Sequence, residues 1–286
     1  MSDEPRFQRK TLAAIIGFAV VGLAGQAQAA AYAVAIDDIS DFTITASAGD
    51  LTFGGAATLS QTNAGSDPLD APAYKVGAAP AGVNEFFPHG PSALDFVYAD
   101  AQVGNPDVAT GGAAANIAEV NQVTPGSGTT GILDASNTLN VPAFDLSEDA
   151  RITFSFTADP YIETTVGLGG TANASIGFNI SLNDTDVSFD WTPDGAPGGF
   201  SCVGAGADCT EVDPFDLSIA LTGDDLYDPG PGVFTFTSQL LPAGSYQLNV
   251  NMIERAQASV PEPATLALLG LGLAGLGISR RRKAAV

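Results

Sequence analysis

The chain has 286 residues, of which 32 are Asp or Glu and 10 are Lys or Arg, so its formal net charge at pH 7 is -22. A surface this acidic repels phosphate groups and attracts divalent cations, which excludes nucleic acid as a partner. Seven of the ten cations lie at the two ends, and residues 30–260 keep three Lys or Arg against 29 Asp or Glu. Solubility in a secreted or salt-exposed protein is the other explanation for this charge.

Residues 1–29 have the pattern of a secretory signal peptide. A basic start precedes an apolar run at 12–24, and Ala27 and Ala29 provide small residues for a cleavage site. We expect this segment to form a helix, to engage the Sec translocon and to be cut by signal peptidase after Ala29. A retained N-terminal anchor is the alternative.

The middle of the chain, residues 30–259, alternates apolar and polar residues with period two. The clearest examples are 152–158 (ITFSFTA), 175–183 (SIGFNISLN), 233–240 (VFTFTSQL) and 245–253 (SYQLNVNMI). Such segments predict half-buried strands, and the Gly, Pro, Asn and Asp clusters between them predict turns. We therefore predict an all-β ectodomain, an antiparallel β-sandwich or jelly roll.

Two parts of this region fit the strand pattern less well. Residues 62–130 are rich in Gly, Ala and Pro, and we interpret them as a loop-rich insertion into a single sandwich, with two separate domains as the alternative. Within them, residues 113–123 are the one stretch with helical character, enough for one or two turns.

The chain has two cysteines, Cys202 and Cys209, in FSCVGAGADC. In an exported chain this spacing predicts a disulfide that closes a small loop. Two cysteines and one histidine, His89, are too few for a zinc site built of Cys and His. His89 lies between Pro88 and Gly90 and is interpreted as a loop residue, and no G-x-S-x-G pattern accompanies it.

A calcium site is conceivable at the turn in NDTDVSFD, where carboxylates and backbone carbonyls could supply oxygen ligands. The candidate ligands are Asp184, Asp186 and Asp190. A second candidate is TGDDLYDPG, with Asp224, Asp225 and Asp228. Neither group has the spacing of an EF-hand, and Asp in these positions also stabilises turns through its own side chain. The chain is expected to need no cofactor, with Ca²⁺ as the one candidate.

Two further functions depend on aromatic and acidic residues of the same region. An exposed Trp191 with two tyrosines on one sheet face would indicate a carbohydrate-binding module, whereas a buried Trp191 would indicate a core role. Scattered carboxylates could in principle serve a glycosidase, but no pair stands out. We therefore expect no enzymatic activity.

The C-terminal segment, residues 260–286, has three parts in fixed order. Pro261, Glu262 and Pro263 come first, an apolar run at 264–278 follows, and a basic cluster ends it with Arg280, Arg281, Arg282 and Lys283. The run would rise about 23 Å as a helix, short of the roughly 30 Å hydrocarbon core, so it is a marginal transmembrane helix. The basic cluster places its end in the cytoplasm. An ordinary membrane anchor is the alternative to a sorting signal.

This tripartite tail resembles the PEP-CTERM sorting domain. The resemblance implies that an exosortase of a Gram-negative bacterium recognises Pro261 to Pro263 and removes the tail after transient insertion in the inner membrane. It further implies a cell-surface or extracellular-matrix protein of biofilms, associated with extracellular polysaccharide. A finer similarity, to the EDSAP family of such proteins, is based on the overall layout and on SEDA at Ser147 to Ala150, although the five-letter motif itself is not present.

Overall fold

The computed structural model describes residues 30–55, 61–64, 73–78, 90–105, 107–123, 131–140, 143–167, 169–184, 186–204, 208–260 and 271–273. Strands account for nearly all of the regular structure in these residues, so the all-β prediction is confirmed. The strands are β1 (Ala31–Ala46), β2 (Leu51–Phe53), β3 (Gln61–Ala64), β4 (Ala73–Ala78), β5 (Phe96–Asn105), β6 (Gly112–Gln122), β7 (Gly131–Asn140), β8 (Phe144–Leu146), β9 (Ile152–Ala158), β10 (Tyr161–Val166), β11 (Thr171–Asn183), β12 (Ser188–Trp191), β13 (Phe200–Val203), β14 (Thr210–Val212), β15 (Ala220–Thr222), β16 (Asp225–Tyr227), β17 (Gly232–Thr237), β18 (Gly244–Tyr246) and β19 (Leu248–Ser259).

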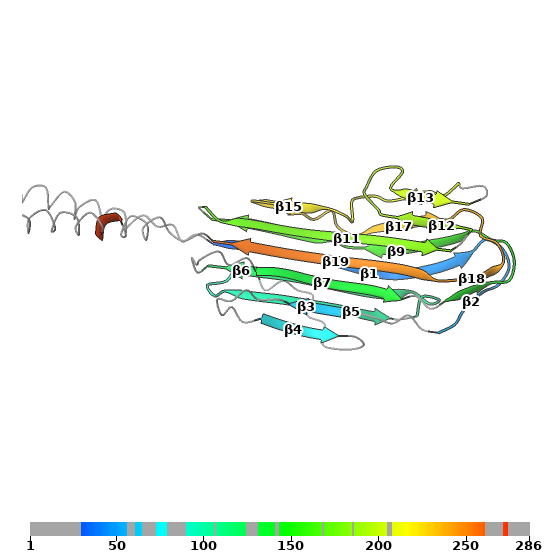
Figure 1. Ribbon diagram of the computed structural model, residues 1–286, viewed down its shortest axis with the longest axis horizontal. Helices are drawn as coiled ribbons and strands as arrows, with labels where there is room; N and C mark the ends of the chain where they lie inside the picture. The colour runs from blue at the N-terminus through cyan, green and yellow to red at the C-terminus, as the bar shows by residue number, and fades with distance from the viewer. Residues whose placement is uncertain are drawn as a thin grey trace, which may run out of the picture.

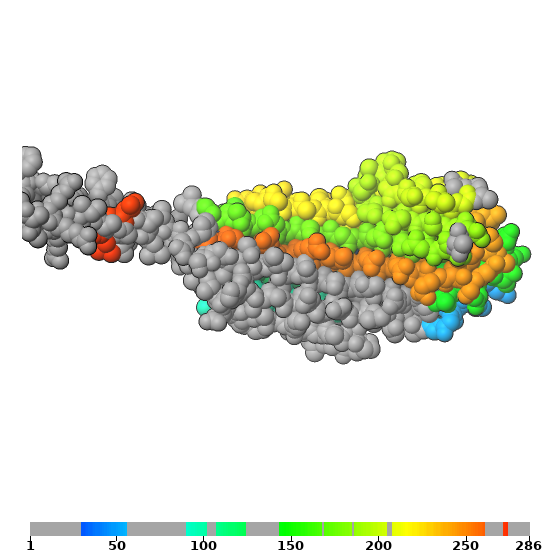
Figure 2. Space-filling view, viewed as in Figure 1, coloured from blue at the N-terminus to red at the C-terminus, as the bar shows by residue number. Residues whose placement is uncertain are grey.

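Two large sheets make up the body of the protein (Figure 1). The first sheet has the order β14-β17-β9-β1-β6-β5-β4; in addition, β10 pairs with β1, and β16 pairs with β10. The second has the order β13-β12-β11-β19-β7-β3, with β15 on β11, and a small third sheet joins β18, β8 and β2. Neighbouring strands in the described residues run antiparallel except for β4 and β5, which are parallel. Figure 2 shows β19 and β11 lying side by side along the body.

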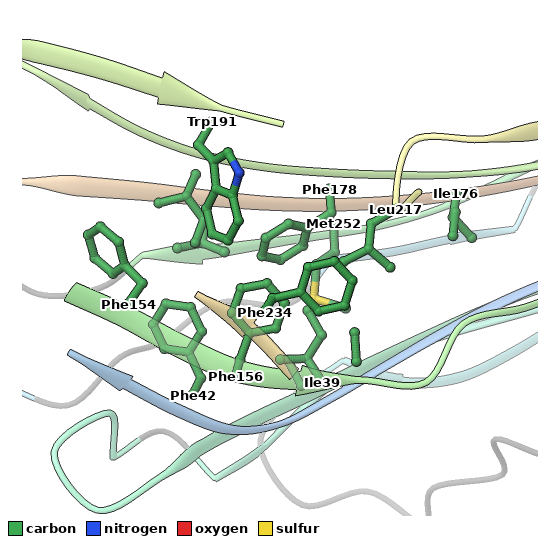
Figure 3. Packing of buried hydrophobic residues seen from close by; sticks show 14 of the residues in the cluster. Ile39, Phe42, Phe154, Phe156, Ile176, Phe178, Trp191, Leu217, Phe234 and Met252 are labelled. Atoms are coloured by element: carbon green, nitrogen blue, oxygen red, sulfur yellow. The ribbon is translucent and has the colours of Figure 1, made fainter. Parts of the chain in front are cut away.

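The core lies between the two large sheets and follows from the alternation of the strands. On β9, Ile152, Phe154, Phe156 and Ala158 are buried while the residues between them are partly exposed. The inward faces of β11 and β19 meet them with residues such as Phe178 and Met252, as Figure 3 shows. Alternating apolar side chains on each strand thus remove one face of each sheet from water, which is the main stabilising contribution to such a fold.

Strand β1 changes its partner halfway along its length. Ala31 to Ile36 pair with β10, and Ile39 to Ala46 pair with β9, with a register shift between Ser40 and Thr43. Asp41 lies in this shift with φ of 53°, the left-handed region that Asp tolerates better than most residues. The bulge lets one long strand pair with two successive strands along the same edge.

The segment interpreted as a loop-rich insertion contributes strands to both large sheets. Its strand β6 pairs with β1 on one side and with β5 on the other. The helical prediction for residues 113–123 is wrong, because all of these residues except Val123 belong to β6. Their alanines favour a helix in isolation, but pairing along both edges and burial on both faces outweigh that local preference.

Both predicted helical ends lie largely outside the described residues, including all of residues 1–29. Residues 271–273 are helical, within the apolar run of the tail. Among the residues that the structure describes, no helix has the length and apolar character needed to cross a membrane.

The predicted disulfide is present between Cys202 and Cys209, whose Cα atoms are 6.4 Å apart. Cys202 belongs to β13 of the second sheet, and Cys209 directly precedes β14 of the first. The bond therefore fastens the two sheets together near one end of the body.

Replacing both cysteines by serine should lower the free energy of unfolding by about 2–3 kcal/mol, because the bond closes a short loop in the unfolded chain. Urea unfolding followed by circular dichroism would measure the loss. Ser201→Ala is the matched control, since Ser201 is exposed beside Cys202 and should change stability by about 0.5 kcal/mol or less. Equal midpoints for the double variant and the control would contradict this prediction.

Candidate functional site

Both ends of the β-body leave it at the same pole. Ala30, the residue before β1, accepts a hydrogen bond from Gly167 N at 2.6 Å, and Thr171 is the register partner of Ser259 at the end of β19. A Cβ at Gly170 would lie 3.2 Å from the Ala30 carbonyl oxygen and 3.4 Å from that of Ser259. The N-terminal and C-terminal segments are therefore attached side by side, at the pole where β19 ends in Figure 1.

The C-terminal tail follows directly from a central strand of the second sheet. Strand β19 is paired with β11 on one edge and β7 on the other, and Val260 after it is fully buried. The predicted sorting triplet begins one residue later, at Pro261. Like the basic cluster at 280–283 and the cleavage residues Ala27 and Ala29, the triplet lies outside the described residues. Val260, a buried residue of the body, thus lies immediately before the predicted signal.

The predicted calcium residues lie at the opposite pole. Strand β11 runs from Thr171 at the tail-bearing pole to Asn183, about 40 Å away at strand spacing. Asp184 and Asp186 follow in the turn to β12, and Asp190 Oδ1 accepts a hydrogen bond from Asn179 Nδ2 at 2.9 Å. Within the described ranges, no three His, Cys, Asp or Glu side chains gather as a metal-binding group. A surface calcium site at this turn stays a prediction.

Trp191 is a core residue. It is fully buried, its ring stacks on Phe236 with centroids 5.1 Å apart, and its Nε1 donates to Glu211 Oε2 at 2.9 Å. Three of the tyrosines, Tyr32, Tyr98 and Tyr246, are buried as well. A carbohydrate-binding face required an exposed Trp191, and the structure does not have one.

Two carboxylates and an amide lie inside the core, where no function was predicted. Asp37 of β1, Asn116 of β6 and Glu254 of β19 all have a relative exposure of 0%. Asp37 and Asn116 are register partners in the first sheet, and Asn116 Nδ2 donates across the core to the Met252 carbonyl of the second sheet at 3.2 Å. Met252 and Glu254 are inward-facing neighbours on β19. We call Asp37, Asn116 and Glu254 the buried acid cluster.

The oxygens of the buried acid cluster lack donors. Among the described residues, none donates a hydrogen bond to either carboxylate oxygen of Asp37 or Glu254, or to Asn116 Oδ1. Burial first, and then the nearby charges of Asp38 and Asp159, raise the pKa of Asp37 from 3.8 to about 7. Burial and the charge of Asp37 raise the pKa of Glu254, and the nearby Asn116 amide opposes this rise. The amide and the Glu254 carboxylate do not form a hydrogen bond of normal geometry.

Another buried acid, Glu119, shows how the same protein satisfies a carboxylate. Glu119 Oε1 accepts hydrogen bonds from Tyr32 OH at 2.7 Å and from Gly90 N at 2.9 Å, on the outer face of the first sheet. Burial and the charge of Glu119 raise the pKa of Tyr32, which keeps the phenol a donor. Asp37 and Glu254 differ from Glu119 in this respect, because no residue that the structure describes donates a hydrogen bond to their carboxylate oxygens.

A sequence signal for the buried acid cluster does exist. Asp37 follows Ala33 and Ala35 at the inward positions of β1, and Glu254 stands between Met252 and Ala256 on β19. An acid at a position that alternation assigns to the core is uncommon. The strand predicted at 245–253 ends one residue before Glu254, so this prediction assigns Glu254 no inward position.

Taken together, the fold and the tail define an acidic all-β protein whose C-terminal segment leaves one pole directly after a central strand. Residues 259–283 match the family described as the PEP-CTERM protein-sorting motif. The chain is therefore a PEP-CTERM domain-containing protein, as the resemblance of its tail predicted. Comparison with curated proteins gave no match, and comparison with solved structures gave none. The family match covers residues 259–283, so it includes the tail and only the last residue of the β-body, Ser259.

The motif indicates a protein targeted to an exosortase, exported and sorted through the membrane to the cell surface. The shared pole fits this route. The points where the N-terminal and C-terminal segments join the body lie side by side, at the pole opposite the turn between β11 and β12.

Proposed function

We propose that the mature protein is a structural component of the cell surface or extracellular matrix of a Gram-negative bacterium, released from its tail by an exosortase. The single observation that carries the proposal is the sorting motif at 259–283, which begins at the last residue of β19. The acidic body, with its disulfide, would suit a place outside the cell. We propose a structural rather than an enzymatic role, and association with extracellular polysaccharide as its setting.

The location can be tested by fractionating cells that produce the protein from its own gene. We expect the β-body, without residues of the apolar run, in the cell-surface or matrix fraction, and weaker cohesion of the matrix when the gene is deleted. Recovery of the uncut chain from the cytosol, or an unchanged matrix after deletion, would count against the proposal.

Replacing Pro261, Glu262 and Pro263 together by alanine should block tail removal. The expected result is accumulation of the membrane-bound precursor, measured by immunoblotting and by the mass of the C-terminal peptide. The matched control is Ala284→Ser with Ala285→Ser, which lies beyond the matched segment and should leave processing unchanged. Processing of the triple variant at the wild-type rate would show that the triplet is not the recognised element.

A further inference from the structure

We propose that the buried acid cluster binds one hard divalent cation of the Ca²⁺ class between the two large sheets. Five oxygen atoms form the proposed ligand set: both carboxylate oxygens of Asp37, both of Glu254, and Oδ1 of Asn116. They come from three strands, two in the first sheet and one in the second. A cation there would hold the sheets together from within.

The chemistry of the donors fits such a cation. Ca²⁺ takes six to eight oxygen ligands, carboxylates among them in bidentate form, so the five oxygens leave room for backbone carbonyls or water. Two ionised carboxylates carry the charge that one divalent cation neutralises. Mg²⁺ fits less well, because it demands strict octahedral geometry and keeps several of its waters.

The surroundings of the cluster point the same way. The inward neighbours of Asp37 and Asn116 along their strands include Ala35 and Ala118, which are register partners and fully buried. Ala256 is the inward neighbour of Glu254 on β19 and is also buried. Small apolar side chains cannot donate hydrogen bonds, and buried carboxylates without partners are costly to a fold.

Protonation or internal water would be the competing ways of satisfying these oxygens. Two protons would turn two of the five oxygens into O–H donors and leave three acceptors, more than two O–H groups satisfy one to one, so protonation alone leaves an acceptor unmet. Water would supply donors but would not neutralise two carboxylates within the core. A cation does both, which is why we favour it.

The test uses the full-length chain in detergent, unfolded in denaturant and refolded with 1 mM CaCl₂ or with EDTA, followed by gel filtration and elemental analysis. We expect about one Ca²⁺ per wild-type chain and a higher unfolding temperature in CaCl₂ than in EDTA. In Asp37→Asn with Glu254→Gln both effects should disappear. In the control, Asp184→Asn with Asp186→Asn and Asp190→Asn, both should persist.

A second variant keeps the test decisive if the double variant does not fold. Asn116→Asp adds a third carboxylate, so a cation site should bind Ca²⁺ at least tenfold more tightly and gain more in unfolding temperature on adding CaCl₂. A wild-type chain that refolds without bound metal overturns the proposal, whether protons or water then satisfy the cluster. The proposal is also overturned if the Asp37→Asn, Glu254→Gln variant still binds Ca²⁺ while the control with Asp184, Asp186 and Asp190 replaced does not. That result would assign the ion to the turn at 184–190.

Discussion

Phe156→Ala should lower the free energy of unfolding by about 3–5 kcal/mol, a large part of the stability of a typical domain. Phe156 is 1% exposed and occupies the centre of the aromatic core. Its ring centroid is 4.9 Å from that of Phe178 in the opposite sheet and 5.2 Å from that of Phe234, with which it stacks. Figure 3 shows these rings filling the space between the sheets. Truncation removes contacts on both sides and leaves a cavity that rigid strands cannot close.

Urea unfolding monitored by near-ultraviolet circular dichroism would measure this loss, because the signal arises from packed aromatic rings. Val233→Ala is the control: Val233 lies on β17 beside Phe234 but is 58% exposed, so its truncation should cost about 0.5 kcal/mol or less. If the two variants unfolded at the same urea concentration, the ring cluster would not be the centre of the core.

Period-two alternation was enough to predict which residues would form the best strands and which side of each would be buried. Residues 152–158 became β9 with the expected alternation. Alternation failed in β6, where both faces are buried and an alanine-rich sequence carries no period. There the neighbours β1 and β5, brought together by long-range pairing, decide the conformation. Such pairing is a property of the whole sheet and leaves little trace in a local segment.

The sorting tail could be predicted because its signal is contiguous: triplet, apolar run and basic cluster follow one another within 27 residues. The buried acid cluster is the opposite case. Asp37, Asn116 and Glu254 are separated by up to 217 positions and meet through sheet register and the packing of one sheet on the other. Each is an ordinary polar residue in its own segment, and only the fold makes the combination unusual.

In EDTA, the stability of the protein should fall as the pH rises from about 4 to 7, and Asp37→Asn should remove part of that fall. The unfolded pKa of Asp37 is near 3.8 and the folded one about 7, so between these values the folded chain holds a proton that the unfolded chain has lost. Its stabilising effect is therefore fully present below pH 3.8 and is lost as the pH rises through 7. The slope is about 1.4 kcal/mol per pH unit, or about 4 kcal/mol over the whole window.

The difference between wild type and Asp37→Asn isolates this effect from the general repulsion among the other acids, which both proteins share. Besides burial, the charges that raise the pKa of Asp37 are those of Asp38 and Asp159, and Asp37 in turn raises the pKa of Glu254 across the core. Urea unfolding at each pH unit from 4 to 8 would measure the free energy of unfolding of both proteins. If the two plots of this free energy against pH fell in parallel, the prediction for Asp37 would be contradicted. Adding CaCl₂ should flatten the wild-type curve, since a bound cation favours the ionised carboxylates and competes with the proton. The same two side chains would then be stabilised by protons in acid and by the cation at neutral pH.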